Sequence, residues 1–130
     1  MPPAIMILGL GTDIIEVARI QGSVEKFGDS FLHRILLPEE IAYCRGYQQP
    51  AQYVAARFAA KEAISKAFGT GIGSQLGWHD MEICRNESGA PFVRLQGGGQ
   101  DLFHSRNAKQ LLLSLSHTHL YATAVAILEG

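Results

Sequence analysis

The chain has 130 residues, which is enough for one domain with a buried core and too short for two ordinary domains. Eleven basic residues against twelve acidic ones leave a formal net charge of −1, so the composition gives no sign of a nucleic-acid-binding surface. The two cysteines, Cys44 and Cys84, lack the spacing of a zinc or redox motif, which favours a reducing cytoplasm over a disulfide framework.

The first ten residues are apolar, but they lack the positively charged start of a signal peptide and a glycine interrupts them at Gly9. No apolar run in the chain approaches the ~20 residues that a membrane helix needs. We therefore expect a soluble protein that is not exported and does not bind a membrane. No repeat, low-complexity tract or linker divides the sequence, so we expect a single domain over residues 1–130.

Residues 5–10 are predicted to form a short buried strand, which the glycines of the following GLGTD segment would end. Asp13 then matches a helix cap, because Glu16 follows it by three residues in the capping-box spacing. Apolar residues after Asp13 supply a helical face, and the helix is expected to continue loosely toward His33.

Two prolines mark the starts of further helices. Pro38 opens PEEIAYCRG, with two glutamates in the first turn and an arginine and glycine at the end. Pro50 precedes the longest predicted helix, residues 51–68, which Gly69 would end in a left-handed conformation. Small alanines dominate this helix, so another element or a ligand could approach it closely.

The second half of the chain is rich in predicted strands. Residues 80–85 and 91–96 flank the turn NESG and indicate a hairpin, and a short helix is expected in GGGQDLFHSRNAKQ. LLLSLSH and LYATAVAIL predict two more strands around a tight polar turn. Hairpins beside clustered helices favour an α+β fold with mainly antiparallel strands over a doubly wound parallel sheet.

The long helix carries Lys61, Glu62 and Lys66 in its alanine-rich surroundings. Glu62 precedes Lys66 by four residues, the favoured orientation for an exposed helix pair that contributes ~0.2–0.5 kcal/mol. The alternative is that these charged residues belong to a catalytic or metal-binding site. Asp13 and Glu62 together would supply two carboxylates for a magnesium ion, which is commonly held by one or two carboxylates plus phosphate oxygens and water. Lys66, one turn from Glu62, would then neutralise phosphate charge.

Other residues are weaker candidates. The GTGIG segment after the long helix would let backbone amides approach a nucleotide, although a helix stop followed by a loop explains its glycines equally well. His117 and His119 in SHTH fit partly buried histidines better than metal ligands. The basic side chains that are candidate contacts for phosphate or for an acidic partner are Arg19, Arg34, Arg45, Arg57 and Lys61.

The sequence resembles the small holo-acyl-carrier-protein synthases, the short class of 4′-phosphopantetheinyl transferases. The resemblance rests on ILGLGTDIIEVARI, RFAAKEAISKAFGTGIG and LSLSHTHLYATAVAIL, whose order and spacing cover almost the whole chain. It implies transfer of phosphopantetheine from coenzyme A to a serine hydroxyl of an apo acyl carrier protein, with release of adenosine 3′,5′-bisphosphate and with help from Mg²⁺. It leaves the base that accepts the serine proton open between a carboxylate and a water.

The resemblance also implies roles for individual residues. Asp13 and Glu62 would be the metal ligands, and Lys66 would lie by the diphosphate, so that these three are the expected catalytic residues. Arg19 would meet the acidic recognition helix of the carrier protein. The residues expected to line the coenzyme A site are Arg57, Gly69, Thr70, Gly71 and His117.

Three further expectations come from the resemblance. The protein would be a homotrimer with sites between neighbouring subunits, and it would serve fatty acid biosynthesis in the cytoplasm. Residues 1–5 extend beyond the usual family start and would be dispensable or disordered. A coenzyme A or nucleotide binding module without transferase activity is the alternative function, and a structural trimer with a purely surface-exposed charged helix is a third.

Overall fold

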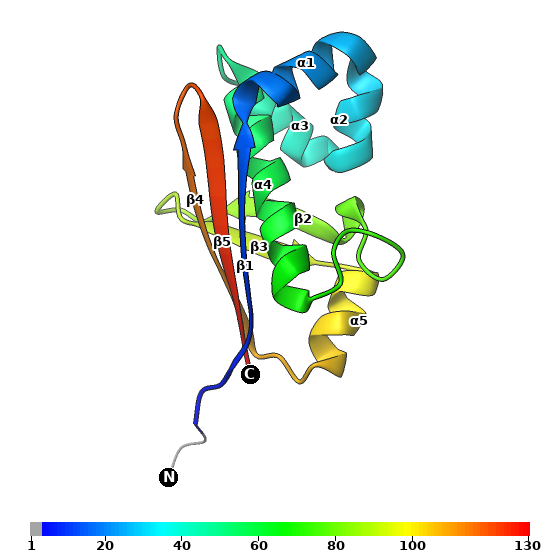
Figure 1. Cartoon of the computed structure of the whole chain (residues 1–130), viewed down its shortest axis with the longest axis vertical. Coiled ribbons are helices and arrows are strands. Elements are labelled where there is room, and N and C mark those ends of the chain that lie inside the picture. The colour runs from blue at the N-terminus through cyan, green and yellow to red at the C-terminus, as the bar shows by residue number, and fades with distance from the viewer. Residues whose placement is uncertain (1–3) are drawn as a thin grey trace.

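The structure, a computed structural model, describes residues 4–130. Its elements, shown in Figure 1, are β1 (Ile7–Glu16), α1 (Val17–Phe27), α2 (Asp29–Ile35), α3 (Pro38–Arg45), α4 (Pro50–Phe68), the 3-10 turn η1 (Trp78–Asp80), β2 (Met81–Arg85), β3 (Pro91–Leu95), α5 (Gly98–Ser105), β4 (Gln110–His117) and β5 (Tyr121–Glu129). Of the predicted N-terminal extension, residues 1–3 lie outside the described part, whereas Ala4 and Ile5 belong to no helix or strand.

All strand pairing is antiparallel. The larger sheet has the order β1-β5-β4, and β2 pairs with β3 in a separate hairpin. Helix α4 packs along one face of the larger sheet, with α1, α2 and α3 gathered at one end and the β2–β3 hairpin and α5 beyond the helix (Figure 1). This arrangement confirms the predicted α+β class. No helix among residues 4–130 combines the length and apolar character needed to cross a membrane.

Contact between β1 and α4 depends on two glycines. A Cβ atom on Gly9 would lie 1.8 Å from the backbone oxygen of Ala67, and a Cβ on Gly11 would lie 1.8 Å from that of Ala63. Any side chain at these positions would therefore push the helix off the strand. The predicted close approach to the alanine-rich helix is confirmed, but the approaching element is a strand.

Several predictions for the N-terminal region are wrong. The strand is not buried, since Ile7 and Leu10 are 60% and 63% exposed. The glycines do not end the strand, and Asp13 is no helix cap, because it lies within β1 and pairs with Ala124 of β5. Asp13 therefore takes part in pairing between β1 and β5, and does not form the helix cap that its spacing to Glu16 indicated. Helix α1 begins only at Val17 and lacks a side-chain cap, and Gly28, at φ 61°, separates it from α2 where one continuous helix was predicted.

The remaining predicted elements are confirmed with small shifts of their ends. Helix α3 begins at Pro38, and α4 begins at Pro50 and ends at Gly69, which has the left-handed φ of 77°. The β2–β3 hairpin, α5 and the β4–β5 pair lie where their patterns indicated. In these segments the local signals and the tertiary contacts favour the same structure.

Candidate active site

Asp13 of β1 meets the charged side of α4. Lys66 Nζ lies 3.1 Å from Asp13 Oδ1 and donates a 2.9 Å hydrogen bond to the backbone oxygen of Thr12. Lys66 therefore pairs with a residue 53 positions earlier, and the alternative of an isolated surface pair with Glu62 is wrong. The fold thus joins the two sequence segments whose charged residues were predicted to cooperate.

Glu62 shares this cluster. Burial raises the pKa of the Glu62 carboxyl, the negative charge of Asp13 raises it further, and Lys66 opposes both effects. The Asp13 carboxylate thus lies close enough to disfavour the charge of Glu62, and Lys66 offsets part of that effect. Added positive charge between them would stabilise both, so these oxygen donors suit a hard divalent cation.

Within residues 4–130 there is no group of three or more His, Cys, Asp or Glu side chains that could hold a metal ion. A cation bound by Asp13 and Glu62 would accordingly have two protein ligands. Its other positions would be filled by water or by substrate oxygens, which is the usual state of protein-bound magnesium.

Lys61 has a different role from its two charged neighbours. Its side chain is fully buried, and its Nζ donates to the backbone oxygens of Ile35 (2.7 Å) and Trp78 (3.1 Å) and to Glu40 Oε1 (2.7 Å). All three ammonium protons are used. The hypothesis that Lys61 contacts phosphate or an acidic partner is wrong, because no ligand can reach it.

Glu40 completes this buried ion pair. Its Oε1 also accepts from the backbone N–H of Leu37 at 2.8 Å, and its Oε2 accepts from that of Ile83 at 3.0 Å. Burial lowers the pKa of Lys61, and the Glu40 carboxylate opposes that shift. The pair connects α4 to α2, α3, η1 and β2, and no pattern in the sequence indicated that Glu40 and Lys61 would meet.

The loop after α4 has open space beside its glycines. Gly69 and Gly71 adopt positive φ, and a Cβ on either would meet nothing within 4 Å. The amide groups of Gly69, Thr70 and Gly71 are already bonded to the carbonyls of Ser65 and Lys66 in the helix-capping turn. These three amides are therefore used within the chain, and the expectation that a ligand lies beside this loop rests on the open space.

Arg57 lies on another side of α4. It is 2% exposed, its guanidinium covers the ring of Tyr43 at 4.1 Å, and its Nε has no hydrogen-bond partner among residues 4–130. The neighbouring Cys44 is buried, which raises the pKa of its thiol to about 11 although Arg57 opposes the shift. A buried cation with an unpaired donor is unusual and is consistent with a role in binding an anion.

His117 is the last residue of β4 and is half-buried, as predicted, whereas His119 lies in the following turn and is exposed, so the prediction of partial burial is wrong for His119. The imidazole of His117 packs against the edge of Tyr53 at 5.0 Å, and Tyr53 stacks on Tyr47 at 3.6 Å. Burial, followed by the charge of Arg85, lowers the pKa of His117. Gln52, whose position in the sequence carries no functional signal, hydrogen-bonds both histidines.

The candidate residues form two groups on opposite sides of α4. Tyr53, Arg57 and His117 make up the first group, and Asp13, Glu62 and Lys66 make up the second. At about 100° per residue, Tyr53 and Arg57 fall within ~40° of each other, and Glu62 and Lys66 fall about 180° away from them. His117 belongs to the first group through Tyr53, and Asp13 to the second through Lys66. Within a single chain, the predicted phosphate contacts Arg57 and His117 therefore lie on the opposite side of α4 from the predicted metal ligands, Asp13 and Glu62.

The remaining basic candidates lie on the helical end of the molecule. Arg19 of α1 is exposed, and Arg45 of α3 forms an exposed ion pair with Asp29. Arg34 of α2 is also exposed. None of the three contacts the residues of either group around α4 in the described hydrogen bonds and ion pairs.

Residues 9–126 match the 4′-phosphopantetheinyl transferase superfamily. The chain is 46% identical over 124 residues to the holo-[acyl-carrier-protein] synthase of Koribacter versatilis, covering 95% of this chain and 99% of that protein. It is 48% identical over 121 residues to the synthase of Chlamydia trachomatis serovar D, covering 93% and 98%.

Solved structures agree. The Neisseria meningitidis holo-[acyl-carrier-protein] synthase superimposes with a TM-score of 0.90 at 34% identity, over 96% of this chain and all of that one. The Helicobacter pylori synthase, solved in complex with coenzyme A, has a TM-score of 0.82 at 35% identity, over 92% and 98%. The chain belongs to the 4′-phosphopantetheinyl transferase superfamily, and the resemblance noted in its sequence is confirmed.

Proposed function

We propose that this chain is a holo-[acyl-carrier-protein] synthase. It transfers 4′-phosphopantetheine from coenzyme A to a serine hydroxyl of an apo acyl carrier protein and releases adenosine 3′,5′-bisphosphate. The observation that carries the proposal is the convergence of Asp13, Glu62 and Lys66 where β1 meets α4, in a chain whose near full-length relatives are synthases.

The residues of this cluster fit the chemistry. The serine oxygen forms a bond to the phosphorus that carries pantetheine, and the bond from that phosphorus to the departing bisphosphate breaks. Negative charge grows on the phosphate oxygens, and the ammonium of Lys66, held by Asp13 and Thr12, offsets it from a fixed position. Lys66 remains half exposed, so the diphosphate can reach it from solvent.

The reaction depends on Mg²⁺ in this proposal, and Asp13 and Glu62 would hold the ion. When bound, the ion supplies additional positive charge at the diphosphate. The raised pKa of Glu62 and the closeness of Asp13 support this assignment, because a bound cation would offset the burial and the neighbouring negative charge that disfavour ionised Glu62.

Coenzyme A would also contact the loop at Gly69, Thr70 and Gly71, with Arg57 and His117 near its phosphates. The buried positive charge of Arg57, whose Nε has no partner among residues 4–130, and the charge of Arg85 near His117 would both favour an anion in this region and support these two assignments. Arg19, exposed on α1 immediately after the strand that carries Asp13, would bind the acidic helix of the carrier protein.

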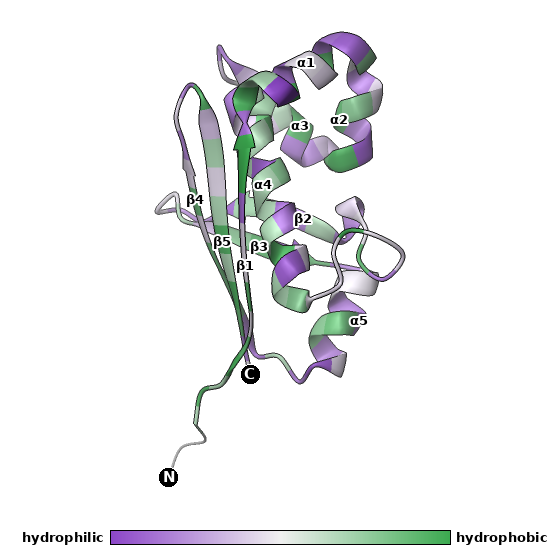
Figure 2. Cartoon of the chain, viewed as in Figure 1, coloured by the Kyte–Doolittle hydropathy of each residue, from purple (hydrophilic) through white to green (hydrophobic). Residues whose placement is uncertain are grey.

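The protein would act as a homotrimer whose sites lie between subunits. Two observations support this. The face of the larger sheet away from α4 is apolar and exposed, with Leu10 and Ile14 of β1 at 63% and 65% and Val125 of β5 at 40%. Figure 2 shows hydrophobic residues along β1. In addition, the two groups of site residues lie on opposite sides of α4, so a neighbouring subunit is needed to bring them together.

Solution mass tests the oligomer. Light scattering should give three times the 14.2 kDa of one chain, and Val125→Lys, which places a charge in the middle of the apolar sheet face, should give single chains. Ser116→Lys at the end of neighbouring β4 is a matched control at the edge of that face and should perturb assembly less. A wild-type chain that is monomeric at assay concentration would contradict the trimer.

We place the protein in the cytoplasm and in fatty acid biosynthesis, where holo acyl carrier protein is used. The free thiols of Cys44 and Cys84 are consistent with a reducing compartment.

The transfer itself is tested by incubating the protein with apo acyl carrier protein, coenzyme A and Mg²⁺ and then weighing the carrier. The expected result is a mass increase of one phosphopantetheine, which disappears when the metal is chelated. A carrier of unchanged mass with every divalent metal tried, together with measurable binding of coenzyme A, would instead favour the binding module without transferase activity.

A further inference from the structure

Gln52 of α4 joins the two histidines at the end of β4. Its Oε1 lies 3.2 Å from His117 Nδ1, and its Nε2 lies 3.0 Å from His119 Nδ1. Its Nε2 also donates to Gln49 Oε1 at 2.9 Å. The amide therefore uses both of its N–H groups and its oxygen.

These contacts assign different protonation states to the two rings. An amide oxygen only accepts, so His117 Nδ1 must carry a proton. An amide N–H only donates, so His119 Nδ1 must be bare. The contact to Gln49 Oε1 is consistent with the orientation assigned to the Gln52 amide, since Nε2 donates to both Gln49 and His119.

The difference decides which histidine can become a cation without breaking a bond. His117 can gain a second proton on Nε2 and keep its bond to Gln52. His119 would lose its bond on gaining a proton at Nδ1. Among residues 4–130, His117 Nε2 has no hydrogen-bond partner, so it is the ring nitrogen that remains free for a ligand.

The surroundings of His117 are basic and aromatic. From α4 it faces Gln52 and the edge of Tyr53, and from β2 the charge of Arg85 acts on it. No carboxylate contributes to its pKa, which burial and Arg85 lower. Free His117 is therefore neutral near pH 7, and an anion bound at Nε2 would favour its protonated form.

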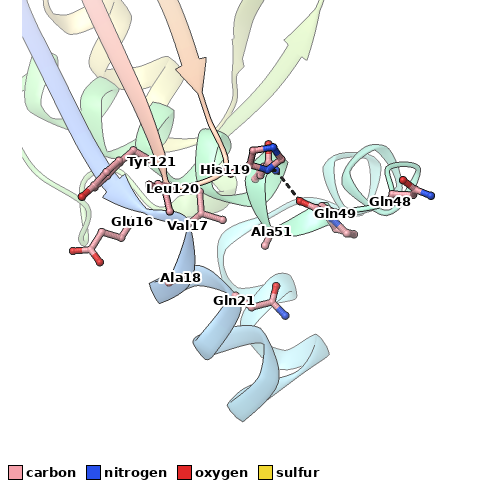
Figure 3. Close-up of a pocket in the computed structure, with 12 residues that line it drawn as sticks. Glu16, Val17, Ala18, Gln21, Gln48, Gln49, Ala51, His119, Leu120 and Tyr121 are labelled. Carbon is pink, nitrogen blue, oxygen red and sulfur yellow. Dashed lines mark hydrogen bonds between the residues drawn. The ribbon is translucent and has the colours of Figure 1, made fainter.

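We infer that Gln52 is a positioning residue that holds His117 with Nδ1 protonated and Nε2 free to donate to a phosphate group of coenzyme A. The inference rests on the proposed function for the identity of the ligand. The glutamine also holds the β4–β5 turn through His119. Figure 3 shows this end of the molecule, where Gln49 and His119 line a hollow of about 490 Å³ between α1 and α4.

A consequence is that coenzyme A binding takes up a proton at His117. The pKa of His117 is low in the free protein and rises when the phosphate binds, so affinity should fall as the pH rises past the pKa of the free ring. Calorimetry in buffers of different ionisation enthalpy measures this uptake. The other charged or titratable groups that face His117 are Arg85, whose charge acts on it, and Tyr53, which packs against it.

The test uses Gln52→Leu, which removes all three hydrogen bonds, in the full-length protein. The dissociation constant of coenzyme A should rise about fivefold, the effect of one ordinary hydrogen bond, while kcat at saturating coenzyme A stays within twofold. Dephospho-coenzyme A distinguishes the phosphates: a loss with both ligands places His117 at the diphosphate, and a loss with coenzyme A alone places it at the 3′-phosphate. Gln48→Leu, an exposed neighbour without these contacts, is the matched control.

A second readout requires neither ligand nor turnover. Nitrogen-15 NMR of the ring nitrogens should show His117 with a protonated Nδ1 and His119 with a bare Nδ1. Gln52→Glu has a side chain that can accept a hydrogen bond but not donate one. It should preserve the protonated Nδ1 of His117, while Nδ1 of His119 should no longer be held without a proton. The inference is overturned if wild-type His117 is protonated on Nε2 alone, or if Gln52→Leu binds coenzyme A with unchanged affinity. If the NMR and binding results are as expected but the carrier protein stays unmodified, only the proposed transfer is overturned.

Discussion

Glu62→Gln is expected to reduce phosphopantetheine transfer by at least ~10²-fold, or ~2.7 kcal/mol of transition-state stabilisation. The change keeps the size of the side chain and removes the negative charge that would hold a cation opposite Asp13. Transfer is measured from the mass of the carrier protein over time, and metal binding from calorimetry with Mn²⁺ as the probe. The transfer rate and the affinity for the metal should both decrease in this variant.

The variant should fold at least as well as the wild type. Because burial and Asp13 raise the pKa of Glu62, its charged form is less favourable in the folded chain than in the unfolded one. That penalty is present once the pH is above the folded-state pKa, and a neutral glutamine removes it. An unchanged or raised melting temperature with lost activity would therefore identify a role in the site, not in stability.

Glu87→Gln makes the same chemical change in the exposed turn between β2 and β3, and it should alter neither transfer nor metal binding. Retention of wild-type turnover in Glu62→Gln would remove Glu62 from the catalytic set. Normal coenzyme A binding in both variants, without transfer by the wild type, would support the binding module instead.

Lys61→Met should destabilise the fold by ~3–5 kcal/mol, because it leaves the buried Glu40 carboxylate without its cation. The carbonyls of Ile35 and Trp78 lose their donor as well. A domain of this kind has ~5–15 kcal/mol of stability in total, so the variant would be close to unfolding at physiological temperature. Urea unfolding at one fixed protein concentration measures the loss.

A double-mutant cycle isolates the ion pair. Adding Glu40→Gln to Lys61→Met removes the stranded charge and should recover part of the loss, since the amide oxygen can still accept a backbone N–H. The exposed Arg45–Asp29 pair is the comparison, with an expected coupling of ~0–1 kcal/mol. Equal coupling energies for the two pairs would contradict a special role for the buried one.

Lys61 and Lys66 illustrate how far the sequence alone could reach at the site. Both are lysines on an alanine-rich helix, and the helical spacing of Glu62 and Lys66 predicted a local pair. The tertiary structure places Lys66 against Asp13 and encloses Lys61 with Glu40, partners 53 and 21 positions away. A local pattern carries no information about which distant carboxylate arrives at each lysine.

Asp13 shows the same limit in the fold. Its spacing to Glu16 satisfied a helix cap, and two glycines before it satisfied a turn, yet all lie in β1. The glycines are needed because the backbone of α4 touches the strand at Ala63 and Ala67. Such an approach is a property of two elements together, and conformational preference in either segment does not reveal it.

By itself, the sequence determined the elements with strong local signals: α3 and α4 with proline starts, the glycine end of α4, the β2–β3 hairpin and the β4–β5 pair. Its long motifs determined the family, because spacing over a whole chain is far more specific than any single residue. Only the tertiary structure decided that β1 runs through Asp13, that Lys61 is internal, and that Gln52 joins two histidines. Those features are contacts between elements far apart in the chain, where burial and hydrogen bonding across the core outweigh local preference.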